Sequence, residues 1–197
     1  MPSETLKPQI TIGKNALTAR LDELELEGYM EPFPYLAGVL KYFDHSWLIT
    51  DASKADYQDL HIPVDTLVHS DEPIKFCEVG PGNSELSQLL AQRQPITIIE
   101  PFPYEKCDVI VKNLLEQNIP EPLKQLVVIW GERIFQYINN PNIARYALTL
   151  DQALQTYPEL HHAFDVVVAT GVQFADRSKF QNSLMRLVSP NGHIYPE

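Results

Sequence analysis

The 197-residue sequence has little cysteine, no long apolar run and no secretory leader pattern. Its two cysteines, Cys77 and Cys107, are too few for a disulfide framework or a cysteine-based zinc cluster, which favours a reducing setting. The N-terminus lacks a basic start followed by an apolar run, and no apolar stretch approaches the roughly 18–20 residues of a membrane span. These absences predict a cytoplasmic protein without a membrane partner.

Basic residues are also scarce, since 15 Lys and Arg stand against 26 Asp and Glu, giving a net charge of −11. Residues 1–74 hold 13 of the acids and only 5 of the bases. A nucleic-acid binder needs clustered Lys and Arg to displace counterions from phosphates, so we expect no nucleic-acid partner. The simplest interpretation of the acidic third is a solvated surface, and the alternative is a cationic partner.

The first third predicts helices. Leu17, Leu21 and Leu24 recur at helical spacing, and residues 35–43 form a second amphipathic run. The stretch 44–74 shows no sustained period and predicts loops with short pieces of structure. We therefore expect residues 1–74 to form a helical cap or substrate-side segment, separate from residues 75–197.

From residue 75 the pattern alternates between short β-like runs and amphipathic helices. This alternation predicts an α/β fold with a parallel sheet flanked by helices. The predicted helices cover 84–93, 109–119, 150–157 and 177–188. The predicted strands cover 74–79, 96–99, 125–130, 164–172 and 192–197.

The most informative stretch is FCEVGPGNSE, in which Gly80 and Gly82 connect the first predicted strand to a helix. Glycines there let the backbone approach a ligand where a Cβ would clash. Glu100 ends the next strand, where a carboxylate can accept both hydroxyls of a ribose. A dinucleotide fingerprint requires a third glycine where this chain has Glu85, whose charge would repel a pyrophosphate.

The run from Glu78 to Ser84 resembles motif I of class I S-adenosylmethionine-dependent methyltransferases, in which an acid precedes a Gly-x-Gly turn. The resemblance covers about residues 75–197 and implies a Rossmann-like methyltransferase sheet that binds S-adenosylmethionine. It places Glu100 at the ribose and Glu132, after VVIWG, near the adenine amino group. The cosubstrate-binding residues that it implies are Glu78, Gly80, Pro81, Gly82, Asn83, Glu100, Pro101 and Glu132.

Two features depart from that family. Its sheet normally ends with a sixth and a seventh strand, whereas this chain stops after the fifth, which predicts a fragment or a sheet completed by the N-terminal segment or a partner. An unprotected fifth strand would expose an edge through which a second copy could pair. The segment between the third and fourth predicted strands is also longer than expected.

The sequence gives few signals for catalysis. The loop after the fourth strand carries Thr170, Gln173 and Asp176, each of which has a simpler structural interpretation. Methyl transfer from a sulfonium is an in-line displacement that positioning alone can promote, with or without a general base. No His, Asp and Glu set has the spacing of a metal site, so we expect no metal.

We therefore expect methyl transfer to a small molecule or a protein side chain. Two alternatives stay open at this point. One is a catalytically silent methyltransferase-like module for binding or assembly, which the missing strands favour. The other, which Glu85 disfavours, is an NAD-dependent oxidoreductase.

Overall fold

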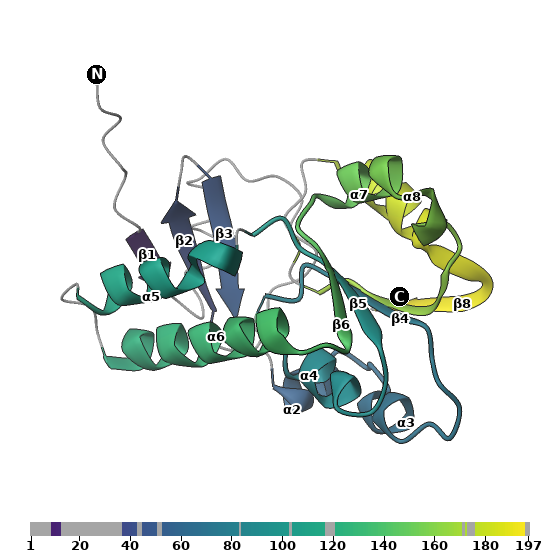
Figure 1. Cartoon of the computed structure of the whole chain (residues 1–197), viewed down its shortest axis with the longest axis horizontal. Coiled ribbons are helices and arrows are strands. Elements are labelled where there is room, and N and C mark those ends of the chain that lie inside the picture. The colour runs from purple at the N-terminus through teal and green to yellow at the C-terminus, as the bar shows by residue number, and fades with distance from the viewer. Residues whose placement is uncertain are drawn as a thin grey trace.

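The described strands of this chain form two sheets, one antiparallel with three strands and one parallel with five (Figure 1). Both lie within the part of the chain that the computed structural model describes. That part comprises residues 9–12, 37–42, 45–50, 53–82, 84–102, 104–116, 121–170, 172 and 176–195.

The antiparallel sheet consists of β1 (Gln9–Ile12), β2 (Ala37–Tyr42) and β3 (His45–Thr50) in that order. The prediction of a helix over residues 35–43 is therefore wrong. A short apolar run fits either period, and Gly38 costs a helix about 1 kcal/mol relative to Ala. The run forms a strand because it pairs with β3, with Tyr42 opposite His45. The helix predicted around Leu17 to Leu24 lies outside the described residues.

Two short helices, α2 (Lys54–Asp59) and α3 (Val64–Val68), follow the antiparallel sheet. They fall in the segment predicted as loops with short pieces of structure. Ser53 and Asp56 form a capping box at the start of α2, which satisfies backbone amides of its first turn. Tyr57 is buried in one cluster with Phe76 of the parallel sheet, so these helices share the core of the following domain.

The parallel sheet has the strand order β6-β5-β4-β7-β8. All neighbouring strands in it are parallel, and the chain order 3-2-1-4-5 is that of a doubly wound, Rossmann-like sheet. The predicted α/β fold class is thus confirmed. Among the described strands β8 lies at an edge of this sheet, and pairing of a second copy along it stays a prediction. The strands are β4 (Phe76–Val79), β5 (Ile96–Ile99), β6 (Ile143–Tyr146), β7 (Phe164–Val168) and β8 (Val188–Tyr195).

Helices cover both faces of this sheet, as Figure 1 shows. One buried cluster joins it to α4, α5 and α6, and a second joins it to α7 and α8. No helix of the described part is both long and apolar enough to cross a bilayer. The helices are α4 (Glu85–Ala91), η1 (Tyr104–Lys106), α5 (Cys107–Leu115), α6 (Glu121–Asn139), α7 (Leu150–Thr156), η2 (Pro158–Leu160) and α8 (Arg177–Leu187).

One predicted strand, residues 125–130, is wrong because this run lies inside α6. The run looks continuous because α6 carries apolar side chains on two faces: Val127 and Trp130 are buried, while Val128 is 39% exposed. The third parallel strand is instead β6, within the segment that seemed too long for a crossover. Its residues are only partly buried or exposed, so β6 lacks the apolar signal of a central strand.

Candidate functional site

The turn after β4 requires glycine at two positions. Gly80 and Gly82 have φ values of +64° and +50°, a region that L-residues with side chains rarely adopt. The Gly80 N–H donates a 2.8 Å hydrogen bond to the carbonyl of Ile99, which fixes the turn against the end of β5. A Cβ on Gly80 would also lie 2.8 Å from Cγ2 of Val172, in the loop after β7. The predicted turn is therefore present, and the carboxyl ends of three strands approach one another at it.

Glu100 lies directly after β5, and only 8% of its surface is exposed. Its carboxylate accepts hydrogen bonds from the backbone amides of Phe102, at 3.1 Å, and Gly82. Burial nevertheless raises the pKa of Glu100 to about 7, and the nearby Glu78 charge adds to the rise. Its Oε2 lies 4.0 Å from the position of a Cβ on Gly80, so the carboxylate and the glycine turn meet.

Glu78, the acid before the turn, is completely buried in β4. Three hydroxyl groups donate to its carboxylate: Tyr57 at 2.7 Å, Ser84 at 2.8 Å and Ser87 at 2.5 Å. Burial raises the pKa of Glu78, and these three donors oppose the rise. Since a carboxylate offers about four lone-pair positions, this side chain is nearly saturated by the protein itself.

Two further contacts hold the turn from outside the sheet. The Tyr137 hydroxyl of α6 donates a 2.6 Å hydrogen bond to the carbonyl of Ser84. The Glu85 carboxylate accepts the backbone N–H of Lys54 at 2.5 Å, where α2 begins. Sequence reasoning missed Tyr57 and Tyr137 because their partners lie 21 and 53 residues away, and no local pattern encodes such pairs.

Aromatic side chains pack together next to Glu100. Phe102 packs against Trp130 edge-on, with ring centroids 5.0 Å apart, and lies 5.7 Å from Tyr104. The guanidinium carbon of Arg145 lies 5.1 Å from the centre of the Tyr104 ring. Within the described residues, the buried Tyr104 hydroxyl has no hydrogen-bond partner. These packed rings restrict the loop and thereby the position of Glu100.

The loop after β7 contributes one buried polar residue, Thr170, which is 7% exposed. Asp176 accepts the backbone N–H of Lys179 at 2.9 Å and so caps α8. Gln173, the third catalytic candidate, lies outside the described residues. Of the three candidates, Thr170 is therefore the one that the structure places, buried, just after the carboxyl end of β7.

The other predicted binding residues differ in their placement. Pro81 is buried in the glycine turn, Pro101 is exposed after Glu100, and Asn83 lies outside the described residues. The placement of Glu132 after a third strand is wrong, because it is an exposed residue of α6 in a groove with Asp108. The reason is the misassigned strand at residues 125–130, so the structure gives no support for an adenine contact by Glu132.

No family model and no curated protein matches the chain. Solved structures similar to it include a SAM-dependent methyltransferase from Agrobacterium tumefaciens, with 10% identity, a TM-score of 0.45, and coverage of 83% of this chain and 52% of that one. A spermidine synthase from Thermotoga maritima has 12% identity, a TM-score of 0.44, and coverage of 81% and 52%. A PRMT1 enzyme-prozyme complex with AdoHcy from Trypanosoma brucei has 13% identity, a TM-score of 0.40, and coverage of 68% and 36%.

The chain thus spans about half the length of the first two structures and about a third of the last. The Rossmann-like fold follows from the strand order of the chain itself.

Proposed function

We propose that this chain binds S-adenosylmethionine at the carboxyl ends of β4, β5 and β7 and transfers its methyl group to a small molecule or a protein side chain. The observation that carries the proposal is the meeting of Glu100 with the Gly80–Gly82 turn. In doubly wound sheets, ligands bind outside the carboxyl ends of the strands, where the strand order reverses. Here the order reverses between β4 and β7, and the turn follows β4.

Glu100 has the properties of a ribose ligand. Two backbone amides occupy about half of its acceptor positions, which leaves room for two hydroxyl donors. Its two amide bonds also hold the carboxylate in place before any ligand arrives. Because burial disfavours its charge, added donors would stabilise the ionised form, and such hydrogen bonds to charged groups are worth about 1.5–3 kcal/mol each.

The charges around the turn suit a cationic ligand better than a diphosphate. No Lys or Arg occurs between Glu78 and Arg93, whereas Glu78, Glu85 and Glu100 all lie at or beside the turn. A dinucleotide would bring its pyrophosphate against these carboxylates, and this segment offers no Lys or Arg to neutralise it. The sulfonium and ammonium groups of S-adenosylmethionine carry the opposite sign, which favours this ligand over NAD.

Within this proposal the residues divide into two roles. Glu100 would hold the ribose hydroxyls, while Glu78 holds the turn through Tyr57, Ser84 and Ser87 rather than contacting the ligand. S-adenosylmethionine would supply an electrophilic methyl group, and the chain would contribute chiefly binding and orientation. Thr170, at the end of β7, is the candidate for positioning the methyl acceptor.

Calorimetry with S-adenosylmethionine, S-adenosylhomocysteine and NAD tests the proposal. We expect the first two to bind and NAD not to bind. Glu100→Ala should weaken binding at least tenfold, because it removes hydrogen bonds to a charged group. Glu132→Ala is the matched control and should leave binding unchanged. Absence of binding by the first two ligands would refute the proposal.

Turnover separates an enzyme from a silent binding module. Release of S-adenosylhomocysteine can be measured while small-molecule and peptide acceptors are supplied in turn. The enzyme proposal expects acceptor-dependent release that Thr170→Val lowers more in kcat than in the affinity for S-adenosylmethionine. Tight binding without release for any acceptor would support the silent module instead.

A further inference from the structure

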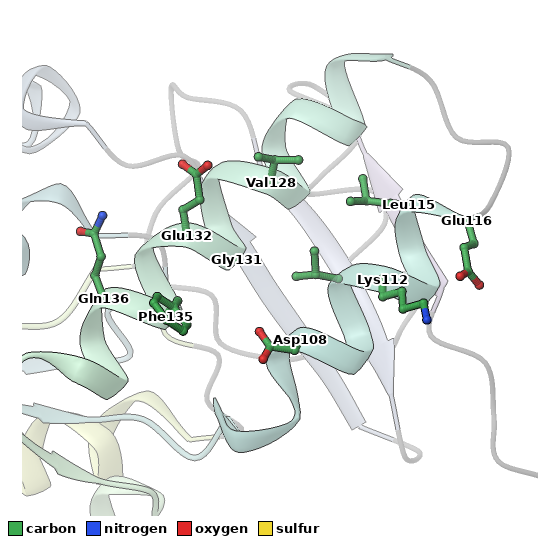
Figure 2. A pocket seen from close by; sticks show the side chains of 10 residues that line it. Asp108, Lys112, Leu115, Glu116, Val128, Gly131, Glu132, Phe135 and Gln136 are labelled. Carbon is green, nitrogen blue, oxygen red and sulfur yellow. The ribbon is translucent and has the colours of Figure 1, made fainter.

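A groove runs between α5 and α6 on the side visible in Figure 2, with a cavity volume of about 710 Å³. Val111 and Leu115 of α5 and Val128 and Phe135 of α6 line it with apolar side chains. It lies apart from the glycine turn and from Glu100, and none of those site residues lines it.

The apolar residues of this groove are not needed to cover the sheet. Ile110 and Leu114 of α5 and Trp130 and Ile134 of α6 already provide buried faces of these helices. Six large hydrophobic side chains of the described part are exposed, and three of them line this groove. Single exposed apolar residues are ordinary, but a contiguous set along one groove marks an interaction site.

The groove has the shape that receives a helix. Its lining residues recur at i, i+3, i+4, i+7 and i+8 on both helices, from Asp108 to Glu116 and from Val128 to Gln136. At Gly131 a Cβ would lie 2.8 Å from Cγ2 of Val111, so glycine lets the two helices approach closely at the floor. A trough between two packed helices accommodates a third through ridges and grooves, with apolar anchors at helical spacing.

Charge determines which helix fits. The charged residues lining the groove are the acids Asp108, Glu116 and Glu132 and a single base, Lys112 (Figure 2). This excess of acids would attract Lys and Arg side chains and repel an acidic segment. A second copy of the chain would bring the same acidic groove and a net charge of −11, so self-association there is disfavoured.

We propose that this α5–α6 groove binds an amphipathic helix of a partner protein, one with an apolar stripe flanked by Lys and Arg. Phe135, which is 57% exposed, is the largest apolar side chain on the α6 side and serves as the anchor there. Asp108 and Glu132 supply the complementary charge. Anchors of this kind dominate helix-in-groove interfaces, while the charged rim sets specificity and association rate.

Two fluorescent probe peptides test this inference. Both are helical and carry leucines at i, i+3, i+4, i+7 and i+11, but one has Lys and Arg flanks and the other has Glu flanks. Fluorescence anisotropy with the full chain should show binding of the basic peptide, weakened by 0.5 M salt, and at least tenfold weaker binding of the acidic one. Equal binding of both peptides, or binding of neither, would overturn the proposal.

Variants of the full chain locate the binding surface. Phe135→Ser should weaken binding of the basic peptide at least tenfold. Val109→Ser, at an equally exposed position of α5 outside the groove, should leave that binding unchanged. Asp108→Lys combined with Glu132→Lys should reverse the preference toward the acidic peptide. Equal losses for Phe135→Ser and Val109→Ser would overturn the proposal, as would a dimer in light scattering that Phe135→Ser dissociates.

Discussion

The Tyr57 hydroxyl donates a 2.7 Å hydrogen bond to Oε1 of Glu78, and both side chains are almost completely buried. This bond attaches α2 to the first strand of the parallel sheet, two residues before the glycine turn. The ionised form of Glu78 depends on such donors because water does not reach it. The chain before residue 75 therefore contributes directly to the site that follows β4.

Tyr57→Phe should destabilise the protein by about 1–3 kcal/mol, because it leaves a buried carboxylate oxygen short of a donor. Burial already raises the pKa of Glu78, and losing a donor would raise it further. Protonated Glu78 needs fewer donors, so the substitution should lower the free energy of unfolding more at pH 8 than at pH 5. Urea unfolding at both pH values measures the difference.

Tyr104→Phe is the matched control, since Tyr104 is as buried as Tyr57 but its hydroxyl has no partner among the described residues. Removing an unsatisfied buried hydroxyl should leave stability unchanged or raise it by about 1 kcal/mol. A loss for Tyr104→Phe as large as that for Tyr57→Phe would show that the bond to Glu78 has no special role.

Glu100→Gln should change how stability depends on pH. The native pKa of Glu100 is about 7 against an ordinary value of 4.5, so the folded state binds more protons between these values. Stability from this group is therefore present at low pH and is lost as pH rises from 4.5 to 7, by as much as about 3 kcal/mol. Between pH 5 and pH 8, the free energy of unfolding of the variant should rise relative to that of the wild type by up to this amount. Parallel pH profiles in urea unfolding would contradict the raised pKa.

Gly80→Ala should destabilise the protein in two ways. Its φ of +64° costs a side-chain-bearing residue about 1–2 kcal/mol, and the added Cβ meets Val172. In a Val172→Ala background the steric part should disappear while the backbone part stays. The cost of Gly80→Ala, measured by thermal unfolding, should therefore be smaller in that background. An unchanged cost would mean that the loop after β7 does not lie against the turn.

Binding of S-adenosylhomocysteine should strengthen as pH rises. Ribose hydroxyls donate to the ionised form of Glu100, whose pKa near 7 leaves it largely protonated at pH 6. The ionised fraction of such a group rises about tenfold between pH 6 and pH 8, and affinity should follow it. Calorimetry across this pH range in wild type and Glu100→Gln shows whether Glu100 causes the dependence. The affinity of the variant for S-adenosylhomocysteine should not change with pH.

Much of the site was predictable because its signals are local. The turn at Gly80 and Gly82 and the strand end at Glu100 depend on residues within a few positions of each other. Four of the five parallel strands also followed from apolar runs bounded by Gly, Pro or polar residues. Such patterns reflect backbone conformation and burial directly.

The errors occurred where tertiary packing decided the structure. Residues 125–130 resemble a buried strand because α6 is apolar on both its core face and its groove face. Residues 37–42 became a strand by pairing with β3, which local helical spacing did not indicate. The edge strand β6 went unnoticed because its residues are half exposed. Likewise, the bonds of Glu78 to Tyr57 and of Ser84 to Tyr137 join distant segments.

The most direct test of the proposed function is a crystal structure of the chain with S-adenosylhomocysteine. We expect both ribose hydroxyls within about 3 Å of the Glu100 carboxylate, against the Gly80–Gly82 turn. A nucleoside bound away from Glu100, with that carboxylate still held only by the amides of Phe102 and Gly82, would contradict the proposal.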